Sequence, residues 1–125
     1  MNVVDSSGWL EYFADGPNVD FFAPPIEDTA QLIVPTIIIY EVFKRVLQQR
    51  GEGEALQAIA VLAQGQVVEL DTPLALNAAK LSVDHKLPMA DSIMLATAQA
   101  HDATLWTQDA DFETMPGVKY IKKAS

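Results

Sequence analysis

Short apolar runs alternate with longer amphipathic stretches along this sequence, and the alternation limits the fold more than any other feature. Between most of the runs lie stretches with helical periodicity, several of which begin at a capping residue or end at a glycine. Strands that alternate with helices predict an α/β fold, with a mostly parallel sheet and helices on both of its faces. The runs typical of strands lie at residues 2–5, 32–35, 66–70, 103–107 and 118–121.

The capping residues indicate where the predicted helices begin. Asp5 or Ser6 can cap the first helix, Thr36 the second, and Thr72 with Pro73 forms the usual start of a helix further along. Gly51 and Gly65 are expected to end two of the helices. We expect helices at residues 6–13, 37–50, 53–64, 73–86 and 89–102.

The segment 15–30 has the least regular pattern in the chain. Gly16, Pro17, Pro24 and Pro25 interrupt its apolar residues. Because proline lacks the backbone N–H that a helix needs, we predict a connection here with only a short helical turn.

Composition excludes several classes of function. The 125 residues suit one domain, 1–125, and 8 Lys and Arg against 17 Asp and Glu give a net charge of −9, so diffuse positive charge cannot attract a nucleic acid. The chain has no cysteine, which excludes disulfides, thiolate zinc sites and cysteine nucleophiles and agrees with a cytoplasmic location. No run of about 18 apolar residues is present, so we expect a soluble protein without a membrane span. Phosphate-binding glycine motifs and the G-x-S-x-G motif are also absent.

Acidic residues stand at the ends of several predicted elements. Asp5 ends the first strand, Asp109 and Asp111 follow the strand at 103–107, and Asp91 opens the helix before that strand. Open parallel sheets bind ligands at the carboxyl ends of their strands, so we expect these acids to share one edge. A further acid, Glu41, lies in a helix that is apolar nearly all round and therefore needs a partner.

Carboxylates that lie close together raise one another's pKa, and a divalent cation relieves that repulsion. Mg²⁺ and Mn²⁺ prefer oxygen ligands and are commonly shared with phosphate oxygens. An all-carboxylate cluster therefore favours metal-assisted phosphoryl chemistry, whereas zinc would need cysteine or paired histidine.

Each acid also has a purely structural explanation. Asp5 could be only a helix cap, and Asp91 suits the first turn of any helix because of the helix dipole. Glu41 could pair with Lys44 or Arg45, three and four residues further on. The two acids after the fourth strand could be ordinary turn residues. The metal interpretation gains weight only when the acids are taken together.

Positive charge is distributed unevenly. Residues 1–40 contain no Lys or Arg, whereas Lys44, Arg45 and Arg50 follow Glu41 in the same helix. These three side chains are candidates for binding the phosphates of a nucleic acid beside the acids, and a solvated helix face is the alternative.

Four segments carry a family resemblance across nearly the whole chain. They contain a strand followed by Asp-Ser, a helical Glu, an Ala-Asp at a helix start and a Thr-x-Asp-x-Asp-Phe motif. In this order they resemble the four acidic blocks of PIN domains, most closely those of the VapC toxins. The segments are VVDSSGWLEYF (3–13), PTIIIYEVFKRV (35–46), LPMADSIMLATAQ (87–99) and TLWTQDADF (104–112).

The resemblance implies a three-layer α/β/α fold and a metal-dependent endoribonuclease that acts as the toxin of a type II toxin–antitoxin pair. It implies that Asp5, Glu41, Asp91 and Asp109 bind Mg²⁺ or Mn²⁺ and carry catalysis. A metal-activated water would hydrolyse the RNA and leave a 5′-phosphate.

Three further residues match secondary positions of the PIN motifs. Thr107 matches the hydroxyl residue before the last acid, Ser6 the one after the first acid, and Asp111 the second acid of the last motif. The family also implies a homodimer and an antitoxin that covers the site, often with an Arg or Lys inserted among the acids.

Two other functions remain open from the sequence. A phosphatase could use Asp5 as a nucleophile, although such enzymes usually carry a second Asp where this chain has Ser7. A PIN scaffold could also serve only to bind a partner, with the acids kept for structure.

Overall fold

The central sheet explains how distant parts of the sequence come together. The computed structural model describes residues 1–124, and its five strands lie side by side in the order β3-β2-β1-β4-β5. Every neighbouring pair is parallel, with Asn2 opposite both Leu32 and Thr104. The predicted α/β fold with a parallel sheet is therefore confirmed. The strands are β1 (Asn2–Val4), β2 (Leu32–Pro35), β3 (Gln66–Val68), β4 (Thr104–Thr107) and β5 (Val118–Tyr120).

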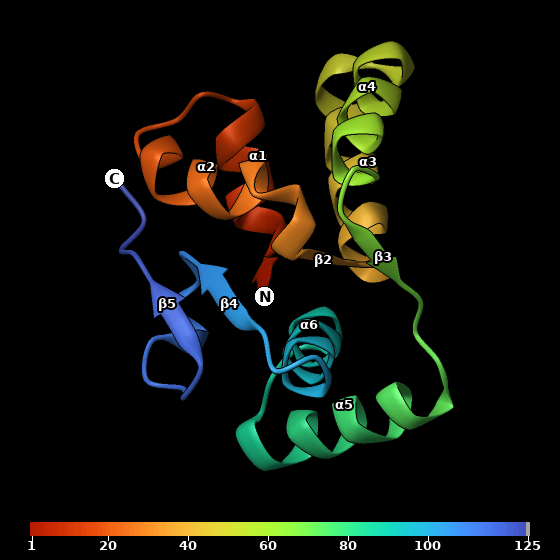
Figure 1. The fold of residues 1–125 in the computed structure, drawn as a ribbon, viewed down its shortest axis with the longest axis vertical. Coiled ribbons are helices and arrows are strands. Elements are labelled where there is room, and N and C mark those ends of the chain that lie inside the picture. The colour runs from red at the N-terminus through yellow and green to blue at the C-terminus, as the bar shows by residue number, and fades with distance from the viewer. Residues whose placement is uncertain (125) are drawn as a thin grey trace.

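Helices cover both faces of this sheet (Figure 1). On one face α6 packs against β1, β2 and β4, with α5 outside it. On the other face lie α1 and α2, and the paired helices α3 and α4 stand beside the β2–β3 side of the sheet. The helices are α1 (Ser6–Phe13), α2 (Val19–Glu27), α3 (Thr36–Arg50), α4 (Glu52–Leu62), α5 (Thr72–His85) and α6 (Met89–Ala100), with short 3₁₀ turns η1 (Thr29–Gln31) and η2 (Ala110–Phe112).

The first turn of α1 lies very close to the sheet. A Cβ atom at Gly8 would come within 2.7 Å of Val4 and within 2.6 Å of Phe22, so only glycine fits there. Val4 and Phe22 are fully buried, as is the neighbouring Trp9 of α1. This packing fixes where the start of α1 stands relative to the end of β1.

The prediction of a mere connection over residues 15–30 is wrong. The structure has the nine-residue helix α2, with Pro24 and Pro25 inside it. Phe22 and Ile26 lie four residues apart on its buried face. Burial of that face outweighs the backbone hydrogen bonds that the two prolines remove.

Two predicted helix starts are shifted by one residue. Asp71, not Thr72, caps α5, and its carboxylate accepts a hydrogen bond of 3.0 Å from the N–H of Leu74. Thr36 is the first residue of α3 rather than its cap, which is Pro35. Of the two residues predicted to cap α1, Asp5 and Ser6, Asp5 is the cap, and its carboxylate accepts a 2.9 Å hydrogen bond from the N–H of Gly8. Helix α3 ends at Gly51 as expected.

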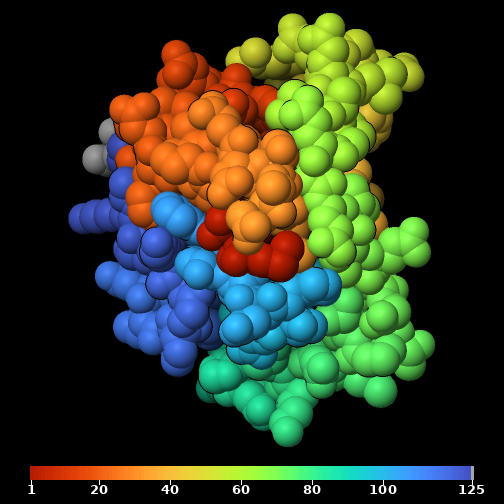
Figure 2. All heavy atoms as spheres, in the orientation of Figure 1, coloured from red at the N-terminus to blue at the C-terminus, as the bar shows by residue number. Residues whose placement is uncertain are grey.

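Because the strands are parallel, they all begin at one end of the sheet and finish at the other. In Figure 2 the start of the chain (red) is visible at the surface, between parts of the orange and light-blue segments. This is the end of the sheet where β1, β2 and β4 begin, so their carboxyl ends lie at the opposite end.

Among residues 1–124, no helix is long and apolar enough to cross a membrane.

Candidate metal centre

The carboxyl ends of β1 and β4 bring the predicted acids together. Val4 and Trp106 are paired in neighbouring parallel strands, so Asp5 and Asp109 follow adjacent strand ends. Asp91 comes from the first turn of α6, which packs under both strands. Four separate segments of the chain therefore supply acids to one place, the fourth being α3 with Glu41.

Three of the acids lie in closest contact. Asp91, Asp109 and Asp111 each offer a carboxylate oxygen within 4.8 Å of the others. Asp91 and Asp109 are half-buried and Asp111 is exposed at the rim. Asp111, which the sequence motifs place in a secondary position, thus belongs to the tightest group.

Asp5 is the most deeply buried of these acids. Its side chain is 3% exposed, and Oδ1 accepts hydrogen bonds from the Ser7 hydroxyl (2.7 Å) and the Gly8 N–H (2.9 Å). Oδ2 accepts a bond from the Thr107 hydroxyl at 2.5 Å. Burial raises the pKa of Asp5 to about 6 although these hydrogen bonds act to lower it. Its role as a helix cap and its place among the acids therefore coexist.

The four other acids all repel the negative charge of Asp91. Burial, followed by repulsion from Asp109, Asp5, Glu41 and Asp111, raises its pKa to about 7. We name the five residues Asp5, Glu41, Asp91, Asp109 and Asp111 the acidic cluster.

Glu41 faces the acids rather than the basic residues of its own helix. Its Oε1 accepts a 3.0 Å hydrogen bond from the Ser6 hydroxyl, across 35 residues of sequence. Within residues 1–124 the only ion pair joins Arg50 to Glu54 at 3.5 Å, so the alternative pairing of Glu41 with Lys44 or Arg45 does not occur.

Thr107 links two of the acids. The fully buried hydroxyl donates to Asp5 and accepts a 2.9 Å hydrogen bond from the N–H of Asp109. Asp109 in turn accepts a bond from the N–H of Asp111 at 2.9 Å, which gives it the turn role that the sequence also allowed. The hydroxyl therefore fixes the end of β4 relative to the end of β1.

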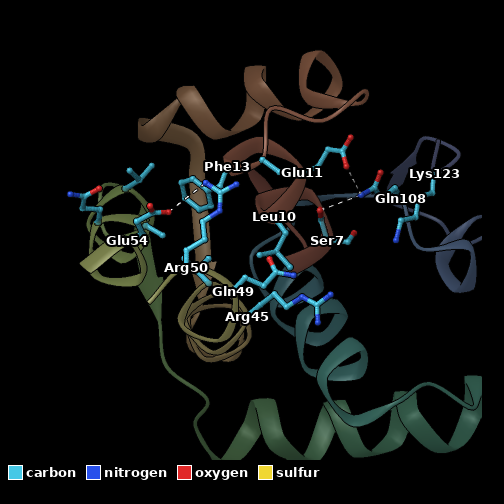
Figure 3. A pocket seen from close by; sticks show the side chains of 15 residues that line it. Ser7, Leu10, Glu11, Phe13, Arg45, Gln49, Arg50, Glu54, Gln108 and Lys123 are labelled. Atoms are coloured by element: carbon cyan, nitrogen blue, oxygen red, sulfur yellow. Dashed lines mark hydrogen bonds and ion pairs between the residues drawn. The ribbon is translucent and has the colours of Figure 1, made fainter. Parts of the chain in front are cut away.

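A groove of about 550 Å³ lies between α1 on one side and α3 with α4 on the other (Figure 3). None of the five acids lines it, but Ser7, which bonds Asp5, and Gln108, which precedes Asp109, do. Leu10, Phe13 and Val46 supply apolar walls, and Arg45 and Arg50 line the α3 side. Two of the three predicted phosphate-binding residues therefore border this groove. Lys44 instead lies over the Tyr40 ring, 5.7 Å from its centroid.

Gln108 was not predicted from the sequence. This side chain is 6% exposed and lies at the border between the groove and the acids. Its position between a buried strand and a turn acid carries no signal by itself. The contacts that distinguish Gln108 come from residues about 90 positions away.

The donor set fits a hard divalent cation. The acidic cluster offers only carboxylate oxygens, which Mg²⁺ and Mn²⁺ prefer and which zinc sites seldom use alone. The mutual repulsion at Asp91 is the kind that a bound cation removes.

Comparison with known proteins agrees with this geometry. The sequence matches the PIN domain family model over residues 3–118. The chain belongs to the PIN domain family. No curated protein matches its sequence significantly.

Solved structures with the same fold come from several bacteria. A toxin–antitoxin complex from Klebsiella pneumoniae has a chain with 23% identity and a TM-score of 0.79, covering 95% of this chain and 96% of that one. VapC20 of Mycobacterium tuberculosis, described as a toxin that cleaves the sarcin–ricin loop, has 16% identity and a TM-score of 0.78, covering 93% and 95%. FitAcB of Neisseria gonorrhoeae has 20% identity and a TM-score of 0.73, covering 98% and 97%.

The link through Thr107 yields a stability prediction. Thr107→Val keeps the shape of the side chain but leaves the Asp109 N–H without its partner, so the free energy of unfolding should fall by about 1–3 kcal/mol. Chemical denaturation monitored by circular dichroism measures this. Thr97→Val is the matched control, because the buried Thr97 hydroxyl bonds only a carbonyl of its own helix. Equal losses for the two variants would contradict a special role for Thr107.

Proposed function

We propose that this PIN domain is a metal-dependent endoribonuclease and the VapC-type toxin of a type II toxin–antitoxin pair. One observation carries the proposal: acids from four separate segments converge where β1 and β4 end, and burial of Asp91 followed by repulsion from the other four acids raises its pKa to about 7. Purely structural caps and turns do not require such convergence. The cost of the repulsion is understandable if the acids are kept to bind a cation.

Asp5, Glu41, Asp91 and Asp109 would hold Mg²⁺ or Mn²⁺, with Asp111 at the rim. When bound, the metal supplies positive charge that activates water and stabilises the negative charge that develops on the phosphate. The protein's part is to aim the carboxylates. The Thr107 and Ser7 hydroxyls orient Asp5, and Ser6 orients Glu41.

The same contacts argue against a phosphatase that uses Asp5 as its nucleophile. Both oxygens of Asp5 accept hydrogen bonds and the side chain is almost fully buried. Such phosphatases usually carry a second Asp two residues after the nucleophile, and this chain has there Ser7, whose hydroxyl donates to Asp5 Oδ1.

The α3 side of the groove is cationic and suits the phosphates of RNA. Arg45 and Arg50 line it, and the exposed pair of Arg50 with Glu54 is weak enough to yield to a phosphate. Arg45→Ala with Arg50→Ala should weaken RNA binding several-fold and reduce the slope of log affinity against log salt by about 0.7 for each phosphate that is no longer neutralised. Fluorescence anisotropy with a labelled RNA measures both quantities.

Lys80→Ala is the control for this double variant, because Lys80 is exposed on α5 outside the groove. An unchanged salt slope in the arginine variant would remove these residues from the RNA-binding surface.

An antitoxin is the second partner that we propose, on the basis of the toxin–antitoxin complexes among the similar structures. The apolar wall of the groove would receive an apolar segment of the antitoxin, and a Lys or Arg of that segment would neutralise the acidic cluster.

The homodimer expected from the sequence is also a proposal. Leu76 and Val83, 68% and 79% exposed, lie on one face of α5 and could meet a second copy.

The proposed activity is tested with the purified protein, a labelled RNA and sequencing of the product ends. We expect cleavage with Mg²⁺ or Mn²⁺, none in EDTA, and products with 5′-phosphate ends. A protein that binds RNA or antitoxin but never cleaves, with either metal, would instead be a binding module.

A further inference from the structure

Gln108 lies between the last residue of β4 and the first acid that follows this strand. Thr107 precedes it and Asp109 follows it, yet its own side chain turns toward α1 (Figure 3). Its Nε2 donates hydrogen bonds to the Ser7 carbonyl oxygen at 3.3 Å and to Glu11 Oε1 at 3.5 Å. Its Oε1 accepts a 2.9 Å bond from Asn18 Nδ2. The side chain is almost fully buried and uses both ends of its amide.

Asn18 extends this network to the segment after β5. Its backbone N–H donates to Glu11 Oε2 at 2.7 Å, and its Nδ2 donates also to the Lys122 carbonyl oxygen at 3.1 Å. The network therefore connects α1, the turn before α2, the end of β4 and the segment after β5. We name Gln108, Asn18 and Glu11 the amide network.

Gln108 connects the amide network to the acidic cluster at two points. Gln108 is covalently joined to Asp109, and Ser7, whose carbonyl it bonds, orients Asp5 through its hydroxyl. Asp109 and Asp111 of the loop after β4 hold carboxylate oxygens within 4.8 Å of one of Asp91, so repulsion between like charges tends to push this Asp109 loop outward. A neutral amide can oppose that movement without adding charge, which neither a carboxylate nor a lysine could do.

We propose that Gln108 is a positioning residue that holds the Asp109 loop against α1 and thereby sets the separation of Asp109 from Asp5. The inference rests on the proposed function, because that separation matters only if the two acids share a cation. Gln108 itself does not touch the metal in this proposal, and its amide is engaged by Ser7, Glu11 and Asn18 rather than by RNA. It acts through the backbone on either side of it.

The test compares Gln108→Leu with the parent protein. Leucine keeps most of the volume but has no amide, so the loop loses its anchor. Titration calorimetry with MnCl₂, without RNA, should show Mn²⁺ binding weakened about tenfold. In cleavage assays kcat should fall about tenfold at limiting Mn²⁺ and recover at excess Mn²⁺, while KM for RNA stays within twofold.

Gln64→Leu is the matched control, because Gln64 is exposed after α4 and should leave all three quantities unchanged. A merely structural Gln108 would lower the unfolding temperature but leave Mn²⁺ affinity and kcat per folded molecule at parental values. That result would overturn the inference.

A second variant guards against misfolding of Gln108→Leu. Asn18→Ala removes the donor to Gln108 Oε1 but leaves residue 108 intact, and we expect a smaller loss of Mn²⁺ affinity in the same direction. Parental Mn²⁺ affinity in Asn18→Ala would contradict the proposal. If the parent protein binds Mn²⁺ and cleaves RNA, such a failure concerns Gln108 alone; if the parent does neither, the proposed function fails and this inference with it.

Discussion

Replacing Asp91 by Asn should lower RNA cleavage by about a thousandfold or more, without loss of folded protein. Asp91 belongs to the closest group of acids, and its carboxylate experiences all four of the others. Removing the charge leaves the side chain the same size but takes away one ligand of the proposed metal site. Cleavage of a labelled RNA at saturating Mn²⁺ measures the loss, and circular dichroism measures the fold.

Asp84→Asn is the matched control, since Asp84 is an exposed acid near the end of α5. It should retain parental cleavage. Asp5→Asn should be as inactive as Asp91→Asn, but it also disturbs the cap of α1 and the bond from Thr107, so it is the less clean test. Cleavage by Asp91→Asn within threefold of the parent would exclude Asp91 from the site.

The second large effect concerns stability as a function of pH. The pKa of Asp91 in the folded protein is about 7 and that of Asp5 about 6, both above the ordinary value of 3.8. Protonation of these two carboxyl groups therefore stabilises the folded protein. The stabilisation is complete below about pH 4, near the ordinary pKa of an unfolded Asp, and it is lost as the pH rises through the folded-state values of about 6 and about 7. In EDTA the free energy of unfolding should fall by about 2 kcal/mol from pH 5 to pH 8, a value reduced from the full shift because Asp91 is partly solvated.

Asp91→Asn should flatten this pH dependence and exceed the parent in stability at pH 8 in EDTA. Mn²⁺ at a hundred times its dissociation constant should stabilise the parent at pH 8 by about 2.7 kcal/mol and the variant by much less. Urea denaturation at each pH, with and without metal, provides these values. A parent whose stability rises from pH 5 to pH 8 in EDTA would show that the acids are held by partners that favour their charged forms.

The predicted fold was correct where local signals and tertiary packing agree. Alternating apolar runs and helix caps located all five strands, and the helices between the first four indicated that these strands are parallel. Strand β5 is also parallel to β4, although only the short turn η2 lies between them. The segment around Pro24 and Pro25 was misjudged because its helix depends on burial of Phe22 and Ile26 under α1, which no local pattern reveals.

The candidate site was predictable to a similar extent and for a similar reason. Asp5, Asp91 and Asp109 stand at element ends, so the sheet topology alone brings them together. Glu41 required its contact with Ser6 before its direction could be known. Gln108 was beyond prediction, because its partners lie far away in the sequence and are joined only by the folded chain.

The claim that the acidic cluster holds a divalent cation is tested most directly by diffraction from crystals soaked in MnCl₂, using the anomalous signal of manganese. We expect an anomalous peak in contact with carboxylate oxygens of Asp91 and Asp109 in the parent, and none in Asp91→Asn under the same conditions. A parent crystal with no peak at the cluster, or with manganese bound only elsewhere, would contradict the claim.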